Sequence, residues 1–402
     1  MNKLITDSGQ VLDSQKEILH EIRNYYTKLY SSRDEELEDI NLNELLGNTE
    51  CYKLNDIEKQ KLESPITKSE ILTVLKGTKS NKSPGTSGFS FEFFKVFWKD
   101  LGTYIFRSFT HSYKVGELSN SQKLGIISIL PKGNKSREYI KNWRPISLLN
   151  STYKLFSGII AHRLKSVLVN FIHENQKGFL PGRFIGENSR LLYDIMHVTE
   201  EENIPGLLLL LDFEKAFDSI SWKFIYKVLN FFNFGQNFIK LIQTILNDPK
   251  LCVIQNGIFS DFFNIGRGCR QGDPASSYIF LLCVEILGIM IRKNKNIKGI
   301  VFKNNEYKLL QYADDTALLL DGTEKSLNSA LSLINQYSKF SGLKPNFEKT
   351  VCIKIGSLKN SHLEFEHKFE ISWNQEPFTF LGIIFSINMN DMVKINYDKK
   401  KV

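Results

Sequence analysis

A run of five leucines that ends in an aspartate sets the strongest constraint on this chain. Residues 207–211 are all leucine, and Asp212 follows them directly. A short continuous apolar run of this kind is typical of a strand buried on both faces. Farther along, Asp314 and Asp315 interrupt a second apolar stretch, LLQYADDTALLL, at residues 309–320. We therefore expect three carboxylates on or beside buried strands, where water is scarce.

These three aspartates predict a metal site. An ionised carboxylate buried without a partner is costly, and neighbouring carboxylates raise each other's pKa. Three that converge need a cation between them, and hard oxygen ligands select Mg²⁺ or Mn²⁺. Two such ions roughly 4 Å apart activate a primer 3′-hydroxyl and stabilise the leaving pyrophosphate, which is nucleotidyl transfer. Because successive side chains of a strand point to opposite faces, a turn between Tyr312 and Thr316 is needed for both Asp314 and Asp315 to reach one site.

Two helices are predicted in the first quarter of the chain. One starts at the capping-box pair Ser14 and Glu17 and continues with apolar residues at helical spacing. Another starts near Ser90 and carries an aromatic stripe that we expect to face the core. The inward positions of this second helix are Phe91, Phe94, Phe97, Trp98, Leu101, Tyr104 and Ile105. The acidic stretch 34–50 between them is typical of a solvated linker or a loose helix.

Strand signals come in pairs. Residues 124–132 and 143–150 are β-rich runs joined by a basic loop, which predicts a hairpin. Asn256 and Gly257 separate two further β-rich runs, LCVIQ and IFSDFFNI. An Asn-Gly pair is the strongest short-range signal of a hairpin turn. Helices are expected among these strands, around residues 222–229 and 279–291. This mixed order favours an α+β fold.

Charge and cysteine usage narrow the class of protein. The formal net charge of +8 favours a partner with a phosphate backbone, although a mildly basic soluble protein is the plainer interpretation. The five cysteines are scattered without zinc or disulfide spacing, which predicts reduced core residues in an intracellular protein. Neither a secretory signal nor a membrane span is indicated. Nuclear and cytoplasmic locations are not distinguished.

The aspartates stand within a longer series of motifs. In chain order these are KSPGTSGFSFEFFK, LPKGNKSREYIKNWRPISLLN, QKGFLPGRFIGENS, LLLLLDFEKAFDSISW, GRGCRQGDPASSYIFLLCVEIL, YADD, GLKPNFEKT and FTFLGIIF. An isolated Asp-Asp pair is more often a solvent-facing turn, but this order and spacing together are very specific. From about residue 77 to 385 the chain resembles the reverse transcriptases of non-LTR (LINE-type) retrotransposons.

The resemblance implies an RNA-directed DNA polymerase that adds deoxynucleotides to a primer 3′-hydroxyl on an RNA template. It also implies a right-hand polymerase fold of fingers and palm. Residues 1–76 would be an N-terminal extension and linker, 77–206 the fingers with part of the palm, 207–386 the palm with the carboxylates and the primer grip, and 387–402 the start of a thumb.

Catalytic roles are also implied by the resemblance. Asp212, Asp314 and Asp315 would be the ligands of two Mg²⁺ ions, with Mn²⁺ as an alternative. Lys349 or Lys344 would protonate the pyrophosphate, and the sequence does not choose between them. The primer grip would comprise Phe380, Leu381 and Gly382.

A second group of residues would bind the nucleotide. Lys132 and Arg144 would meet the triphosphate, since Arg binds phosphate bidentately and Lys acts as a point charge. Gln271 and Gly272 would contact the nucleotide and the template, because glycine permits close backbone approach. Phe217 would lie beneath the sugar and exclude a 2′-hydroxyl, unless it is simply a core aromatic.

Three departures from the family pattern are present. Ser87 replaces the usual aspartate, and Ala275 and Ser276 replace a Leu-Ser pair. The chain also stops at DKKKV where a thumb would follow, and no endonuclease precedes the polymerase. We therefore expect a piece of a longer polyprotein, with an upstream endonuclease and a downstream thumb.

Two other interpretations stay open. The first is a reverse transcriptase of the group II intron maturase type, which shares the YADD hairpin, although KSPGTSG and ISLLN look more LINE-like. The second is a non-catalytic RNA-binding protein that keeps the palm as a scaffold. The three intact aspartates argue against the scaffold.

Overall fold

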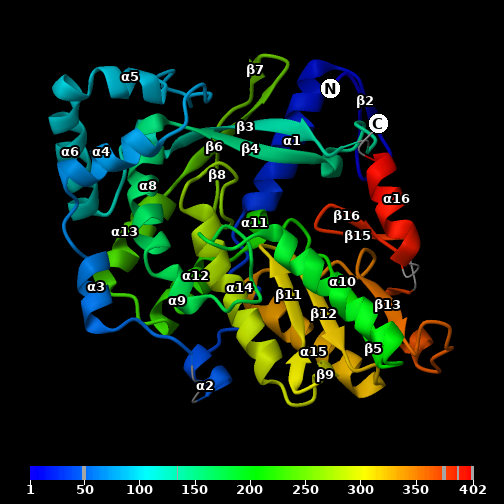
Figure 1. The fold of residues 1–402 in the computed structure, drawn as a ribbon. Helices are drawn as coiled ribbons and strands as arrows, with labels where there is room; N and C mark the ends of the chain where they lie inside the picture. Colours follow the sequence, from blue (N-terminus) through cyan, green and yellow to red (C-terminus); the bar gives the residue numbers. More distant parts are fainter. Residues whose placement is uncertain (48–50, 134, 374–376, 387–388, 400–402) are drawn as a thin grey trace. The chain divides into compact units, whose positions relative to one another are not determined.

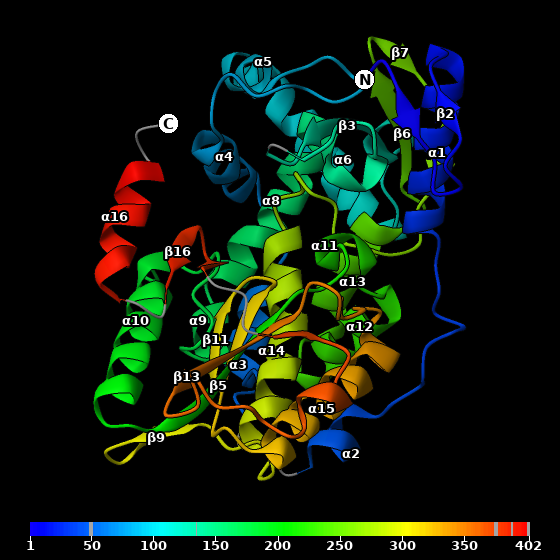
Figure 2. The same cartoon turned by 90° about the vertical axis from the view of Figure 1, so that its right-hand side faces the viewer.

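The computed structural model describes residues 1–47, 51–133, 135–373, 377–386 and 389–399. Two compact units are formed by segments that alternate along the chain, which Figures 1 and 2 colour from blue to red. The first unit comprises Met1–Glu36, Tyr52–Val167 and Phe217–Ile279. The second comprises Leu37–Cys51, Leu168–Ala216 and Phe280–Val402.

The first unit is built on a five-stranded sheet. Strands β3 (Leu124–Pro131) and β4 (Trp143–Leu149) pair antiparallel, which confirms the first predicted hairpin. Strand β6 (Lys250–Gln255) lies parallel to β3 and pairs antiparallel with β7 (Ile258–Phe259) and β8 (Phe263–Asn264). The turn from β6 to β7 has positive φ at Asn256 (49°) and Gly257 (80°), as the predicted Asn-Gly hairpin requires.

An N-terminal helix packs against this sheet. Strands β1 (Leu4–Ile5) and β2 (Val11–Leu12) lead into α1 (Gln15–Tyr30), whose buried residues share a hydrophobic core with Ile127, Leu251 and Phe263. The helix is confirmed with Ser14 at its N-cap. The capping box is not formed, because the Ser14 side chain makes no capping hydrogen bond.

The second predicted helix is divided in two. Helix α5 (Phe91–Val96) ends at Phe97, whose backbone (φ −92°, ψ 20°) leaves the helical region, and α6 (Trp98–Val115) starts afresh. The break shifts the helical phase, so the expectation of a single inward stripe is wrong. Phe97 is 44% exposed and Tyr104 is 68% exposed, whereas Phe91, Phe94 and Ile105 are buried.

The other helices of the first unit surround α8 (Ser151–Lys165), which follows β4 directly. Arg163 of α8 forms a buried ion pair with Glu70, with Nε 2.8 Å from the carboxylate. The remaining elements are α3 (Asp56–Leu62), α4 (Lys68–Gly77), α7 (Asn120–Lys123), the 3₁₀ turn η1 (Ile140–Asn142), α12 (Trp222–Phe231) and α13 (Gln236–Leu246).

The second unit is built on a sheet in the order β11-β12-β5-β13-β14. The leucine run forms β5 (Pro205–Leu211), which pairs antiparallel with β12 (Asp315–Leu320) and β13 (Val351–Gly356). Strand β11 (Leu309–Tyr312) returns into β12 through residues 313–314. The predicted buried strand and the predicted turn are both confirmed. Strand β14 (Ser372–Trp373) lies at the far edge.

Helices cover both faces of this sheet. Helix α10 (Ile185–Glu201) lies on one face and α15 (Glu324–Ser341) on the other, as Figure 2 shows. Helix α14 (Ser276–Lys293) begins in the first unit, and its Cys283 carbonyl accepts a hydrogen bond from the Tyr337 hydroxyl of α15 at 2.9 Å. The smaller elements are α2 (Leu42–Leu46), α9 (Leu168–Phe171), α11 (Ala216–Ser219), β9 (Ile300–Phe302), β10 (Asn305–Tyr307) and η2 (Glu366–Lys368).

The described chain ends with a hairpin and a helix. Strands β15 (Phe378–Phe380) and β16 (Ile383–Phe385) pair antiparallel, and α16 (Met389–Lys399) is tied to β16 by hydrogen bonds between Asn396 and the Ile384 backbone. Of the predicted thumb start, residues 387–388 and 400–402 lie outside the described residues.

Helices and mostly antiparallel strands in mixed order confirm the α+β prediction. All five cysteines are free thiols, and four of them are buried. In the described parts of the chain, every helix is too short or too polar to cross a bilayer.

Candidate active site

The Asp-Asp pair lies at the tip of the β11–β12 hairpin. Tyr312 pairs with Asp315, so Ala313 and Asp314 form a two-residue turn. Ala313 has a φ of 55° and is 4% exposed. The turn lets Asp314 and Asp315 escape the alternation of a regular strand, as the sequence predicted.

The strand register brings Asp212 opposite Asp315. Thr316 of β12 pairs with Leu211 of β5, and the two strands run antiparallel, so the next residue outward on each strand is an aspartate. Residues directly opposite in an antiparallel pair have Cβ atoms about 4.5–5.5 Å apart, and like charges there repel. Two of the three carboxylates are therefore neighbours by virtue of the register alone.

Water is not scarce at these carboxylates, contrary to our expectation. The Asp212 side chain is 44% exposed, Asp314 is half-buried and Asp315 is exposed. The physical reason is that the sheet core ends at Leu211, so the aspartates lie at the open end of the strands. Although Asp315 is exposed as a residue, its carboxylate is partly desolvated, and this desolvation, followed by the charges of Asp314 and Asp212, raises the pKa of Asp315 to about 6.

The segment after α15 holds Asp212 from its other side. The Asn346 N–H donates to the Asp212 carbonyl at 2.8 Å, and the Asp212 N–H donates to Thr350 Oγ1 at 3.5 Å. This connection places Lys349 Nζ 3.7 Å from Asp212 Oδ2. Lys344 contributes its backbone instead, because its carbonyl accepts from the Glu214 N–H at 2.9 Å. Of the two candidate general acids, Lys349 is the one whose ammonium lies beside a predicted catalytic carboxylate.

A cavity of about 290 Å³ joins the carboxylates to the predicted primer grip. Asp212, Asp315 and Lys349 line it together with Phe380 and Leu381. The β15–β16 turn has positive φ at Leu381 (49°) and Gly382 (82°), which is the pattern of a tight type I′ hairpin. The hairpin thus presents its tip to the same cavity as the aspartates.

The carboxylates suit a divalent cation in chemistry and charge. Oxygen donors of net negative charge are the preferred ligands of Mg²⁺ and Mn²⁺. Burial and the neighbouring carboxylates disfavour the charged form of Asp315, and a bound cation would offset both effects. Across the residues that the structure describes, no three His, Cys, Asp or Glu side chains are arranged so that they hold a metal ion as they stand.

The predicted nucleotide-binding residues belong to the first unit. Arg144 is exposed on β4, where it pairs with Leu130, and Lys132 follows β3 and donates from Nζ to the Lys141 carbonyl at 3.0 Å. Both lie where the β3–β4 hairpin ends in its connecting loop. The structure therefore brings these two cations to one end of the same hairpin.

The RQGDP loop lies against β4. The Ser147 N–H donates to the Gln271 carbonyl at 2.8 Å, and a Cβ atom at Gly272 (φ 116°) would lie 2.6 Å from the Ser147 carbonyl oxygen. Only glycine tolerates both conditions, so the close backbone approach that the structure shows at Gly272 is to β4. The half-buried Phe217 joins the same loop, because its carbonyl accepts from the Cys269 N–H at 2.6 Å.

A buried network fastens this loop to α8. The Asp273 carboxylate accepts hydrogen bonds from the Tyr153 hydroxyl at 2.7 Å and from the Ser157 hydroxyl. The Arg270 guanidinium lies 4.5 Å from the Tyr153 ring centroid and donates to its hydroxyl. The loop that carries Gln271 and Gly272 is therefore held at both ends.

Asp218 is a functional candidate that sequence reasoning missed. It is 2% exposed, and its two oxygens accept from the Tyr30 hydroxyl at 2.7 Å and from Gln271 Nε2 at 3.1 Å. Burial, followed by the Asp218 charge, raises the pKa of Tyr30 well above its usual value. The sequence did contain a signal for this buried carboxylate, because Asp218 is an acidic residue among the apolar neighbours of AFDSI.

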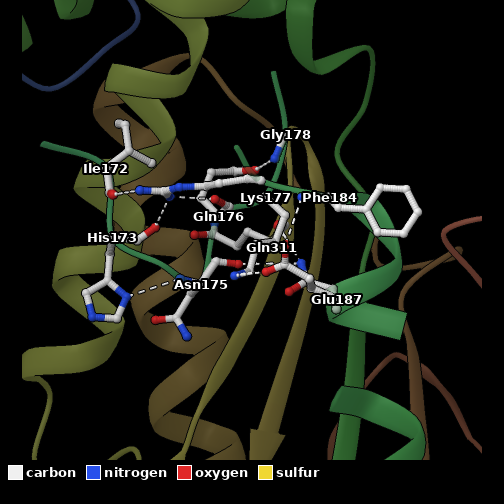
Figure 3. Close-up of polar contacts among 11 residues, drawn as sticks. Ile172, His173, Asn175, Gln176, Lys177, Gly178, Phe184, Glu187 and Gln311 are labelled. Atoms are coloured by element: carbon white, nitrogen blue, oxygen red, sulfur yellow. Dashed lines mark hydrogen bonds and ion pairs between the residues drawn. The ribbon is translucent and has the colours of Figure 1, made fainter. Parts of the chain in front are cut away.

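The QKGFLPGR block also has a role that the sequence did not reveal. Arg183 donates to the carbonyls of Ile172 and His173 at 2.6 Å and of Gln176 at 2.7 Å, which folds the segment on itself. Figure 3 shows the resulting cluster, in which Gln176, Lys177 and Gly178 lie beside Gln311 of β11. The block is therefore packed against β11, the strand that leads into the turn with Asp314 and Asp315.

A second cavity, of about 390 Å³, lies in the first unit between α4 and α8. Its lining combines bases with apolar and aromatic groups, and the described lining contains no acidic side chain. Burial lowers the pKa of Lys154 there. The bases are Lys79, Lys82, Lys154, His162 and Lys165, and the rings are Phe91 and Tyr278.

Comparison with known proteins agrees with this geometry. Residues 130–385 match the reverse transcriptase (RNA-dependent DNA polymerase) family. A 149 kDa protein of transposon TX1 from Xenopus laevis is 32% identical over 95% of this chain and 29% of its own length. The Pol polyprotein of retrotransposable element R2 from Popillia japonica is 26% identical over 73% of this chain and 40% of its own.

A further relative is the probable RNA-directed DNA polymerase of transposon BS from Drosophila melanogaster, 25% identical over 79% of this chain and 35% of its own length. The chain thus spans less than half the length of each of these three relatives. The match to the family covers more than half of this chain and includes every predicted catalytic residue. The chain therefore belongs to the reverse transcriptase (RNA-dependent DNA polymerase) family, among those of non-LTR retrotransposons.

Proposed function

We propose that the chain catalyses RNA-directed DNA synthesis by nucleotidyl transfer to a primer 3′-hydroxyl. The single observation that carries this proposal is the opposition of Asp212 and Asp315 across β5 and β12, with Asp314 on the adjoining turn. The cavity that Asp212 and Asp315 line is also lined by Leu381 at the tip of the predicted primer grip and by Lys349. Deoxynucleoside triphosphates, an RNA template and a DNA primer are the proposed substrates.

Asp212, Asp314 and Asp315 are the proposed ligands of two Mg²⁺ ions, with Mn²⁺ as a substitute. When bound, such ions supply Lewis-acid activation of the attacking hydroxyl and charge neutralisation at the leaving pyrophosphate. The protein's own contribution is to hold three carboxylates together against their repulsion, which the raised pKa of Asp315 supports.

Lys349 is the proposed general acid. Its Nζ lies 3.7 Å from Asp212 Oδ2 at the cavity wall, so an ammonium is held beside the site where negative charge leaves. Lys344 is the less suited alternative, since its backbone carbonyl rather than its side chain is engaged with Glu214.

Nucleotide recognition is proposed for residues of the first unit. Arg144 and Lys132 would bind the triphosphate, and Gln271 and Gly272 would contact the base-paired nucleotide. Phe217 would lie beneath the sugar. The hydrogen bonds that tie the Gln271 loop to β4 and to Asp218 support a rigid recognition surface.

The right-hand architecture is likewise a proposal. Residues 77–206 would supply the fingers and residues 207–386 the palm, with residues 1–76 as an extension and 387–402 as the start of a thumb. Because the relatives are much longer, a parent polyprotein with an endonuclease and a complete thumb is also proposed.

The basic cavity of the first unit is proposed to bind the RNA template. Four lysines provide phosphate contacts, and Phe91 and Tyr278 provide ring faces on which a base can stack. A Lys154 ammonium that is partly desolvated gains from an anionic partner, which supports a phosphate at this position.

Primer extension tests the proposal directly. The purified chain, an RNA template with an annealed DNA primer, the four deoxynucleotides and Mg²⁺ should give products that EDTA abolishes. A DNA template of the same sequence serves as the comparison. Binding of RNA without any extension, in Mg²⁺ and in Mn²⁺, would favour the non-catalytic scaffold instead.

A further inference from the structure

The catalytic turn contains a residue in an unfavourable conformation. Ala313 is the first of two turn residues, and its positive φ of 55° is a position where glycine is preferred. An alanine in this conformation brings its Cβ too close to the backbone. Something outside the hairpin must hold the turn in this shape.

Gln176 contacts both backbone polar groups of Ala313. Its Oε1 accepts from the Ala313 N–H at 2.7 Å, and its Nε2 donates to the Ala313 carbonyl at 3.2 Å. The same Oε1 also accepts from the Gly178 N–H at 2.8 Å, which fixes the orientation of the amide. Gln176 is 2% exposed, so these bonds do not compete with water.

The segment around Gln176 is anchored independently of the turn. Gln176 forms an isolated parallel bridge with Gln311, the Lys177 N–H donates to the Gln311 carbonyl at 2.9 Å, and the Gln311 N–H donates to the Asn175 carbonyl at 3.0 Å. Figure 3 shows Gln176 and Lys177 beside Gln311. The Gln176 side chain therefore projects from a fixed backbone.

Gly178 completes the fit. A Cβ atom at this position would lie 2.6 Å from the Ala313 nitrogen and 3.0 Å from Gln176 Oε1. The φ angle of Gly178 is not positive, so its backbone conformation does not require glycine. Glycine is needed because a side chain would collide with these neighbours. Any larger residue would push the catalytic turn away from Gln176.

We propose that Gln176 is a positioning residue that holds the Ala313 backbone at positive φ and thereby fixes the positions of Asp314 and Asp315, of which Asp315 lines the proposed catalytic cavity. Only a glutamine has the length, the acceptor and the donor to bind both groups. Glutamate lacks the donor, and methionine has a similar shape but neither function. The inference rests on the proposed polymerase function and deepens it, because it assigns a role to the QKG segment.

The test compares five variants with the parent chain: Gln176→Met, Gln176→Glu, Asn188→Ala, and the combinations of Gln176→Met and of Asn188→Ala with Ala313→Gly. Gln176→Met should lower kcat for primer extension by about tenfold or more, because a small displacement of a catalytic group is costly. The KM for deoxynucleotide and the affinity for primer–template should change by less than about twofold, since Gln176 contacts neither. Gln176→Glu, which keeps the acceptor, should retain more activity than Gln176→Met.

Rescue separates positioning from simple destabilisation. Ala313→Gly removes the cost of positive φ, so the double variant Gln176→Met/Ala313→Gly should recover a large part of kcat. Asn188→Ala is the matched control. Asn188 is a buried amide that donates to the Gln311 carbonyl at 2.7 Å, and its loss should lower stability without any rescue by Ala313→Gly.

Amide hydrogen exchange gives a readout that does not depend on activity. In Gln176→Met the peptide that contains residues 311–316 should exchange faster than in the parent, and in Asn188→Ala the turn amides should change less. Unchanged exchange in Gln176→Met, or a loss of kcat that Ala313→Gly leaves untouched, overturns the proposal. If the parent itself fails to extend primers, the proposed function falls and exchange alone decides whether Gln176 holds the turn.

Discussion

At Asp212 and Asp315 two negative charges face each other across neighbouring strands. A protein gains no stability from this arrangement. Partial burial of the carboxylate, followed by the charges of Asp314 and Asp212, raises the pKa of Asp315. Side chains that oppose stability yet stand in such specific positions are characteristic of functional sites. The cost of the site is limited because the carboxylates lie at the open end of the sheet, where water still solvates them.

Asp212→Asn and Asp314→Asn should each abolish detectable primer extension while the fold is retained. Each substitution removes a charged ligand and relieves repulsion, so the urea midpoint of the metal-free variant should equal or exceed that of the parent. Asp321→Asn is the control, because Asp321 follows the other end of β12 and accepts hydrogen bonds from Thr323. Near-parental extension by Asp314→Asn at physiological Mg²⁺ would show that the metal assignment is wrong.

The raised pKa of Asp315 predicts how stability depends on pH in the metal-free chain. The folded pKa of about 6 exceeds the usual 3.8, so the folded state binds this proton more tightly than the unfolded state does. The resulting stabilisation is complete below the unfolded pKa and is lost as the pH rises through about 6. Urea midpoints in EDTA should therefore fall between about pH 5 and about pH 7 in the parent, and fall less in Asp315→Asn. Equal pH dependence in the two proteins would remove Asp315 as the cause.

Phe217 is predicted to select deoxynucleotides. The hydrogen bond between its carbonyl and the Cys269 N–H fixes the backbone that carries the ring, and the ring would then overlap a ribose 2′-hydroxyl. We expect discrimination against ribonucleotides of about tenfold to a few hundredfold. Phe217→Val should raise ribonucleotide incorporation far more than it lowers deoxynucleotide incorporation, as single-nucleotide kinetics with each substrate would measure. If both substrates suffer equally and the melting temperature falls, Phe217 is a core residue.

At the scale of elements, the regular parts of the chain follow from local patterns. The leucine run is β5, the Asn-Gly pair is a hairpin turn, and the Asp-Asp pair lies where a turn was predicted. These features depend on neighbours in sequence, so periodicity and turn chemistry suffice to predict them.

The features that the sequence did not predict depend on distant partners. Gln176 and Ala313 are separated by 137 positions, and Tyr30 and Asp218 by 188. The hydrophobic periodicity of a sequence contains no information about hydrogen bonds between residues so far apart in the chain. The break at Phe97 was missed for a different reason, since the aromatic spacing fits one continuous helix and the change of phase leaves no mark in the pattern.

Helix α1 is predicted to influence nucleotide binding through Tyr30. Its hydroxyl holds one oxygen of Asp218 while Gln271 holds the other, so Tyr30→Phe should loosen the Gln271 side chain. We expect the KM for deoxynucleotide to rise several-fold with little change in kcat, and stability to fall by about 1 kcal/mol. Tyr337→Phe is the matched control, because it removes a buried hydroxyl that bonds to the Cys283 carbonyl. An equal rise of KM in both variants would mean that Tyr30 acts only through stability.

At the scale of the whole molecule, the candidate residues divide between the two units. The first unit contains Arg144, Phe217 and Gln271, and the second contains the three aspartates, Lys349 and the β15–β16 hairpin. The chain passes from one unit to the other between Ala216 and Phe217, within the motif that follows β5. A single short motif therefore supplies the first proposed metal ligand to one unit and the proposed sugar contact to the other.

The net charge of +8 leads to a prediction for nucleic-acid binding. Each phosphate contact by a lysine or arginine releases counterions, so the logarithm of the affinity should fall linearly with the logarithm of salt concentration, by about 0.7 to 0.9 per contact.

If the basic cavity binds the template, Lys79→Gln and Lys165→Gln should each reduce this slope by about one unit. Both lysines are exposed at the cavity rim, so their loss should leave the melting temperature unchanged. Lys99→Gln, an exposed lysine of the same unit outside the cavity lining, should leave the slope as it is in the parent. Fluorescence anisotropy of a labelled RNA–DNA primer–template, over one salt series, measures the affinities of the parent and the three variants. Equal slopes for the cavity variants and the parent would place the template elsewhere, because a lysine that contacts no phosphate releases no counterion on binding.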